Sequence, residues 1–142
     1  MHQVKDQQTE NTVSDAELLQ VMADFLHMGH VENIVAMYRQ DHRYYDWTGD
    51  LLTDERFSVR LGVSVLFEYL IEDGPDDVAL AVPSLVRQLG NEKSWVRGEA
   101  VSVLGIIGSR EALDWVKTMI ADPDDQVVEV ARDILQQAGR KN

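Results

Sequence analysis

The chain has 142 residues and no cysteine, and its hydrophobic content of 44% and charged content of 27% are typical of a single globular domain. The absence of cysteine excludes disulfides, thiolate metal sites and cysteine nucleophiles. With 25 acidic and 13 basic residues the net charge is -12, which disfavours nucleic acid as a partner because a phosphate backbone would be repelled. An acidic chain of this kind favours a partner surface that is basic or apolar.

No apolar run approaches the ~20 residues that would span a bilayer, so the sequence predicts no membrane partner. The first 13 residues are polar and aperiodic, without the apolar core of a signal peptide, and we expect a disordered or frayed tail there. These features predict a cytoplasmic protein.

Residues 14–52 are predicted to form an N-terminal helical cap. Ser14 and Glu17 have the spacing of a capping box, which predicts a helix that runs to about Met28 and stops at Gly29. The apolar residues of this helix are expected to be buried: Leu18, Val21, Met22, Phe25 and Leu26. A second helix is predicted from residue 31 to about 39, burying Ile34, Val35 and Tyr38.

An aromatic segment, residues 40–50, follows these two helices, and it is interpreted as either a short helix or a loop folded against the core. Its rings belong to Tyr44, Tyr45 and Trp47. They could form a structural lid over one end of the fold. They could instead hold a partner, because Tyr and Trp are enriched at interface hot spots.

From residue 53 onward the pattern is regular. Polar turns with Gly, Pro, Asp or Asn separate apolar segments of helical period. The predicted helices cover about residues 57–71, 76–89, 91–108, 109–120 and 126–138, with Gly139 ending the last one. Pro83 lies inside the second of these helices and is expected to kink it.

One apolar stripe recurs in three of the predicted helices. In the middle helix it consists of Val96, Ala100, Val103, Leu104 and Ile107, which lie on one face of a helix. The same apolar pattern recurs 31 residues later and 37 residues earlier, as Val127, Ala131, Ile134, Leu135 and Ala138, and as Val59, Val63, Leu66, Phe67 and Leu70. Spacings of this size indicate a helical-repeat array in which each unit is buried by its neighbour.

The repeating unit reads P-x-L-x3-L, a polar turn, then V-R-x2-A-x3-L and a closing Gly. It resembles the HEAT-repeat family, in particular short bacterial HEAT-like units, from about residue 53 to 139. The resemblance implies an all-α fold, an α-α superhelix in the form of a short right-handed α-solenoid, with repeats over residues 53–142 behind the N-terminal helical cap.

The resemblance also implies a role for one arginine in each unit. In the family, a turn Asp and an Arg six residues later tend to pair from one repeat to the next. The corresponding residues here are Asp54 with Arg60, and Asn91 with Arg97. In the last copy Val128 stands where the Arg would be, as expected of a C-terminal cap. We expect these arginines to hold adjacent units together.

The chain contains no recognisable catalytic or phosphate-binding motif, so the predicted function is non-enzymatic, with no cofactor. We expect a protein–protein interaction or scaffold module that holds another protein or peptide on the surface formed by the second helix of each unit. The candidate binding residues are Tyr44, Tyr45, Trp47, Arg60, Ser64, Glu68, Arg97, Ser102, Glu129 and Asp133.

Two other hypotheses remain open at this stage. The first is an accessory to an enzyme, or a metal- or cofactor-binding protein, that acts through the region from His27 to Trp47. Its candidate ligands are His27, His30, Asp41, His42 and Asp46, although Gly29 should break the helix between the first two. The second is weak self-association through an apolar end of the array.

Overall fold

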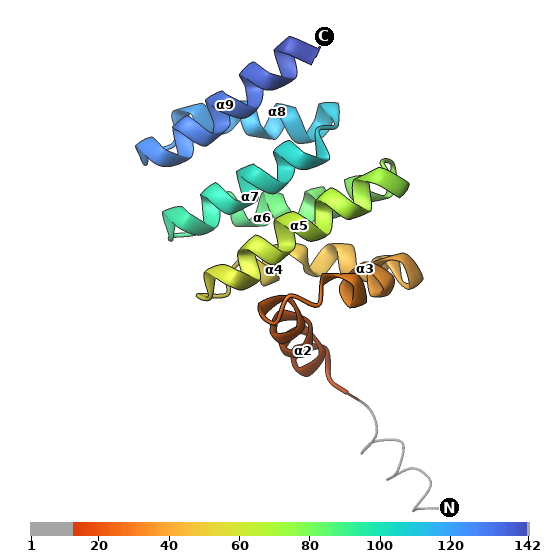
Figure 1. Ribbon diagram of the computed structural model, residues 1–142. Helices are drawn as coiled ribbons and strands as arrows, with labels where there is room; N and C mark the ends of the chain where they lie inside the picture. Colours follow the sequence, from red (N-terminus) through yellow and green to blue (C-terminus); the bar gives the residue numbers. More distant parts are fainter. Residues whose placement is uncertain (1–12, 142) are drawn as a thin grey trace, which may run out of the picture.

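The computed structural model describes residues 13–141, and no β-strand occurs in this range (Figure 1). The chain forms α-helices joined by short turns and 3-10 segments, as the sequence predicts. In chain order these are α2 (Asp15–His27), α3 (Val31–Gln40), η1 (His42–Trp47), α4 (Thr48–Leu51), α5 (Phe57–Asp73), η2 (Asp77–Ala81), α6 (Val82–Gln88), α7 (Ser94–Ile107), α8 (Arg110–Thr118), η3 (Met119–Ala121) and α9 (Asp125–Lys141).

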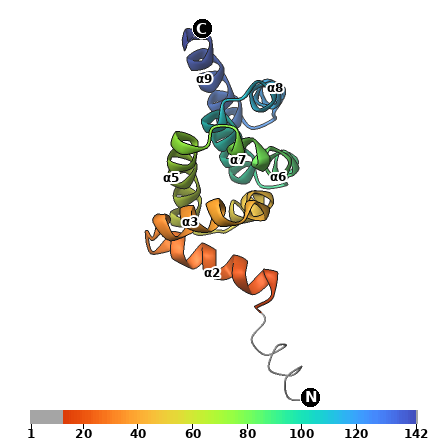
Figure 2. The same cartoon turned by 90° about the vertical axis from the view of Figure 1, so that its right-hand side faces the viewer.

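Three helix pairs stack side by side and form a short α-solenoid. The first unit consists of η1 and α4 followed by α5, the second of η2 and α6 followed by α7, and the third of α8 and η3 followed by α9. The second helices, α5, α7 and α9, form one layer, with α7 packed between the other two (Figure 1). The first helices form the other layer, and the side view shows α6 and α8 on the opposite side of the molecule from α5 (Figure 2).

The recurring apolar stripes form the interior of this array. All five stripe residues of α5 and all five of α7 are buried. Each of these helices packs against helices on both sides and against the layer of first helices. In α9 only Val127 and Ala131 are fully buried. The remaining three, Ile134, Leu135 and Ala138, are partly exposed.

The N-terminal helices α2 and α3 pack against α5 and cover the first unit. The predicted capping box is present, since Ser14 Oγ accepts a hydrogen bond from the backbone N–H of Glu17 and its hydroxyl donates to the Glu17 carboxylate. Gly29 ends this part of the chain with a φ of 85°, the left-handed conformation expected at a helix stop. The part of the predicted tail formed by residues 1–12 lies outside the described residues.

Glycines allow the closest helix contacts between units. A Cβ on Gly49 of α4 would lie 2.4 Å from the carbonyl oxygen of Ser84 in α6. A Cβ on Gly105 of α7 would lie 2.6 Å from Cδ1 of Ile134 in α9. A larger side chain would meet the backbone of α6 at the first position and the Ile134 side chain at the second, so either the neighbour would have to shift or the glycine must stay.

Four details differ from the sequence-based expectation. Val21 is 45% exposed, because α2 buries the side that carries Met22 and Leu26. Helix α9 continues through Gly139 to Lys141, since Gly139 does not adopt a positive φ. The segment predicted as one kinked helix over residues 76–89 is a 3-10 turn followed by α6, in whose first turn Pro83 needs no hydrogen-bond donor. The helix predicted over residues 109–120 ends at Thr118 as α8, and the 3-10 segment η3 follows it.

Within the described part of the chain, no helix is both long enough and apolar enough to cross a membrane.

Candidate partner-binding surface

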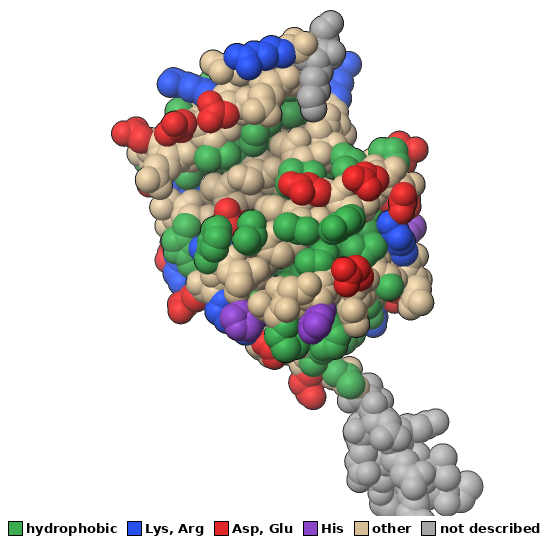
Figure 3. Space-filling view, in the orientation of Figure 1, with side chains coloured by type: hydrophobic (Ala, Val, Ile, Leu, Met, Phe, Trp, Pro, Cys, Tyr) green, Lys and Arg blue, Asp and Glu red, His purple; other side chains and the backbone are tan. Residues whose placement is uncertain are grey.

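The layer formed by α5, α7 and α9 carries a groove along its middle helix. The outward positions of α7 are occupied by small residues, Gly98, Ser102 and Gly105, which follow each other at helical spacing and are only partly exposed. Because the side chains of α7 are so small there, its surface lies lower than those of the flanking helices α5 and α9, which form the two walls of the groove. We call this feature the α7 groove, and the space-filling view shows it as a hollow across the face of the molecule (Figure 3).

The α7 groove consists of two adjoining hollows that share Ser102. The larger has a volume of about 550 Å³ and lies toward the C-terminal end of α7. Most of its lining side chains are aliphatic, and the lining includes Ile71, Gly105, Ile106, Ile134, Gln137 and Ala138. The smaller, of about 280 Å³, lies toward the N-terminal end of α7 and includes Phe57, Arg60, Trp95, Gly98, Gln126 and Val130.

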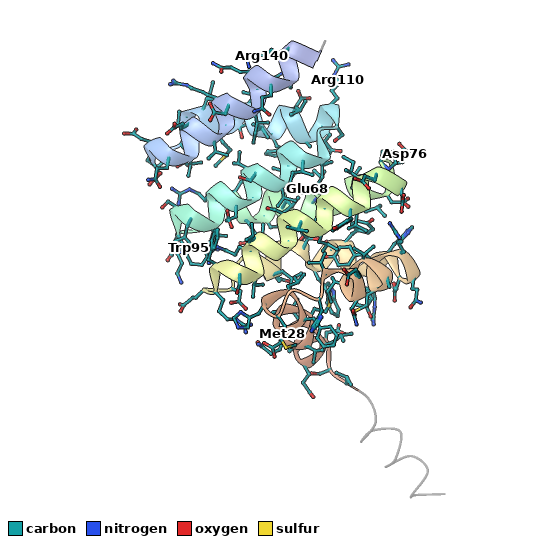
Figure 4. The ribbon with its side chains drawn as sticks, in the orientation of Figure 1. Met28, Glu68, Asp76, Trp95, Arg110 and Arg140 are labelled. Atoms are coloured by element: carbon teal, nitrogen blue, oxygen red, sulfur yellow. The ribbon has the colours of Figure 1, made fainter. Side chains whose placement is uncertain are left out.

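Exposed carboxylates occur on both helices that form the walls of the groove. Glu68 of α5 is exposed, and Figure 4 shows it on the part of α5 that lies beside α7. Glu129 and Asp133 of α9 are also exposed, one helical turn apart. Acidic side chains are therefore exposed on both wall helices, in accord with the net charge of -12.

The one arginine that lines the groove, Arg60, already has partners for its charge. Its guanidinium carbon lies 4.3 Å from the centroid of the Trp95 ring and 5.5 Å from that of Phe57, so the cation is stacked on aromatic faces. Its Nη1 donates to the carbonyl oxygens of Asp54 and Glu55 at 3.0 Å. Its Nε lies 3.3 Å from a carboxylate oxygen of Glu99, within ion-pair distance but without hydrogen-bond alignment. Arg60 thus lines the groove as part of the protein's own structure.

Arg97 is likewise paired, with a carboxylate in the turn of the next unit. Its Nε and Nη2 donate to the two carboxylate oxygens of Asp122 at 2.8 and 3.0 Å, and its Nη1 donates to the carbonyl oxygen of Asn91 at 2.9 Å. These hydrogen bonds hold the pKa of Asp122 below its usual value. The predicted role of Arg97 in joining adjacent units is confirmed.

The aromatic rings predicted near the N-terminus lie mostly inside the molecule. Tyr44 and Tyr45 are 9% and 2% exposed, and Trp47 is partly exposed. The Tyr45 ring packs edge-to-face on Tyr38 with centroids 4.9 Å apart, and Tyr44 packs on Trp47 in the same way at 5.0 Å. The hydroxyl of Tyr38 shares a hydrogen bond of 2.9 Å with Thr48, and burial raises the pKa of this tyrosine. These contacts favour the lid interpretation, because the faces of Tyr44 and Tyr45 are covered by their own chain.

The histidines of the same region lie in separate environments. His27 Nδ1 is 2.6 Å from the hydroxyl of Ser58, His30 packs edge-to-face on Phe25, and His42 lies 3.7 Å from a carboxylate oxygen of Asp77. No group of three or more His, Asp or Glu side chains in residues 13–141 is arranged to hold a metal ion.

The remaining predicted binding residues lie on the walls and floor of the groove. Ser64 of α5 is partly exposed, and Ser102 is the residue common to both hollows. Sequence reasoning missed Gly98, Gly105 and Trp95, and of α9 it missed the lining residues Gln126, Val130 and Gln137. The two glycines could have been noticed, because glycines seven residues apart in a predicted helix share one face and leave it bare.

Comparison with known proteins agrees with this architecture. A family model described as HEAT repeats matches residues 46–136, which is well over half of the chain. The chain belongs to the HEAT-repeat family. The HEAT match begins at residue 46, near the end of η1. It therefore includes the last residues of the segment 14–52, which was predicted as the N-terminal cap. No curated protein and no solved structure gives a significant match.

Proposed function

We propose that this HEAT-repeat chain is a non-enzymatic interaction module that holds another protein or peptide in the α7 groove. The observation that carries the proposal is the groove itself, an apolar hollow open to solvent and bounded by helices of three successive units. Stacked repeats create extended surfaces of this kind, and apolar hollows with polar rims are the usual form of protein-binding sites.

The residues of the larger hollow support binding more than chemistry. The larger hollow contains aliphatic and small side chains, with Ser102 and Gln137 as its polar side chains. Neither of these is an acid or a base at neutral pH. Since Arg60 is occupied by its own neighbours, the groove offers shape and apolar area to a partner.

Site-specific photo-crosslinking tests this proposal. A photoreactive residue placed at Gln137, which is exposed and lines the larger hollow, should form adducts with a partner in cells that express the protein. Gln136 provides the matched control, because it has the same side chain and is also exposed, but is turned by about 100° around the helix. Mass spectrometry of the adducts then identifies the partner.

A groove-filling substitution completes the test. Ser102→Phe should abolish the adducts formed at residue 137, whereas Thr118→Phe, at an exposed position of α8 in the other layer, should leave them unchanged. Equal adducts at residues 136 and 137, or none at 137, would contradict the proposal.

A further inference from the structure

We infer that the occupant of the α7 groove is an amphipathic α-helix with an apolar stripe flanked on both sides by Lys or Arg. The inference rests on the proposed function and specifies the chemistry of the partner. Three independent properties of the groove lead to it: its apolar floor, its all-helical construction and the sign of the charges on its two walls.

The apolar floor requires a ligand with apolar side chains in a row. The larger hollow offers Ile106, Ile134 and Ala138, and the smaller offers Trp95 and Val130. The two hollows lie along the axis of α7 on either side of Ser102. A ligand that fills both must therefore carry apolar side chains separated along its own length, as a helix does at positions i, i+3, i+4 and i+7.

The helical construction of the groove selects against an extended ligand. Both walls and the floor are α-helices, whose backbone N–H and C=O groups are already paired within each helix. An extended peptide would lose water from its own backbone groups and find few replacements. The lining offers the side chains of Ser94, Ser102, Gln126 and Gln137. The carboxylates of Glu99 and Asp124 are already engaged, by Arg60 and by the backbone N–H of Gln126 respectively. A helical ligand satisfies its backbone internally and incurs no such loss. The bare positions Gly98 and Gly105 let its side chains reach the floor.

The wall charges select a basic ligand. Glu68 stands on the α5 side, and Glu129 and Asp133 stand on the α9 side, all of them exposed. The arginine that lines the groove is engaged by Glu99 and by two aromatic rings, so its charge is already balanced. Lys or Arg residues on both flanks of the ligand would face carboxylates, whereas acidic flanks would be repelled.

Designed peptides provide a direct test. The probe is a fluorescein-labelled peptide of 18 residues with leucines on one helical face and lysines on both flanks, titrated with the full chain and followed by fluorescence anisotropy. Three control peptides isolate the three properties: one with Lys replaced by Glu, one with the same composition but no amphipathic order, and one with a central proline that breaks the helix. We expect the basic helical peptide to bind at least tenfold more tightly than each control and to gain helicity in circular dichroism.

Variants of the protein locate the binding. Glu68→Lys combined with Asp133→Lys should weaken binding of the basic helix at least tenfold. Glu111→Lys combined with Asp114→Lys makes the same change in net charge on exposed positions of α8, and should weaken it less than threefold. Ser102→Phe should weaken binding without changing net charge, and its circular dichroism spectrum shows whether the variant is folded.

The outcomes separate this inference from the proposed function. Equal weakening by the two charge variants would overturn the inference, as would equal binding of the acidic or proline-containing peptide, or no binding by any peptide. If the photoreactive residue at position 137 nevertheless captures a protein, the interaction module stands and only the basic-helix inference fails. If it captures nothing either, both proposals fail.

Discussion

The guanidinium of Arg97 binds both oxygens of the Asp122 carboxylate, at 2.8 and 3.0 Å, across the boundary between the second and third units. The two side chains are only 13% and 5% exposed, so the pair is largely shielded from water. Paired N–H···O bonds to a carboxylate fix orientation as well as distance. This contact sets how the last unit docks on the array.

Asp122→Asn should lower the free energy of unfolding by about 1–3 kcal/mol, because a shielded guanidinium loses its counter-charge. Asparagine keeps an oxygen that can accept the backbone N–H of Asp124, so the turn itself is preserved. Urea unfolding followed by circular dichroism measures the change. The control Asp114→Asn, which removes an exposed partner of Lys117, should change the free energy of unfolding by at most about 0.5 kcal/mol.

Acid should weaken the fold in a defined pH range. The hydrogen bonds from Arg97 and Arg56 hold the pKa values of Asp122 and Asp54, respectively, below the ordinary value for aspartate. A lowered pKa in the folded state contributes stability that is complete above the unfolded-state pKa of about 3.9 and is lost as the pH falls below it. The free energy of unfolding should therefore decrease from pH 5 toward pH 3. In Asp122→Asn this decrease should be smaller, and an unchanged decrease would contradict the assignment of Asp122.

Asn91→Asp should stabilise the junction between the first and second units. Asn91 occupies the position in the second unit that Asp122 occupies in the third, and its side-chain oxygen accepts the N–H of Lys93 just as Asp122 accepts that of Asp124. Arg60 of the preceding unit lies near Glu99 without hydrogen-bond alignment, and position 91 offers it no carboxylate. We expect the substitution to raise the free energy of unfolding by about 1 kcal/mol. A decrease would show that Arg60 cannot use the new charge.

Two glycines of α7 should respond in opposite directions. Gly105→Ala forces a Cβ to within 2.6 Å of Ile134, and overpacking of this kind costs about 1–3 kcal/mol, more than the ~1 kcal/mol gained in helix propensity. Gly98→Ala places its Cβ 3.8 Å from Val127, an ordinary contact, and should stabilise by about 0.5–1 kcal/mol. Thermal unfolding of both variants gives the comparison. The same sign for both would mean that the contact of α7 with α9 is more adaptable than its geometry indicates.

The repeat architecture could be predicted from the sequence because the same apolar stripe occurs three times, beginning at Val59, Val96 and Val127. A pattern repeated at constant offset specifies stacking without knowledge of any single contact. The helix stop at Gly108 was predictable for a related reason, since its φ of 65° is a conformation that glycine readily adopts.

The details that could not be predicted depend on which side of a helix meets a neighbour. Helix α2 has apolar residues on more than one side, so its sequence does not decide whether Val21 or Ala23 is buried; packing on α5 decides it. Glycine commonly ends a helix, but at Gly139 the helix continues to Lys141. The groove could not be predicted for the same reason. Its depth at Gly98 and Gly105 depends on α5 and α9, which belong to the neighbouring units.

Each unit of the array contains a single tryptophan: Trp47 in the first, Trp95 in the second and Trp115, 39% exposed on α8, in the third. Three variants that each retain one indole, with Phe at the other two positions, would give every layer its own fluorescent reporter. Neighbour-dependent repeats separate first where a neighbour is missing. The emission of Trp115 should therefore change at a lower urea concentration than that of Trp95, and the fluorescence would show in which order the layers come apart.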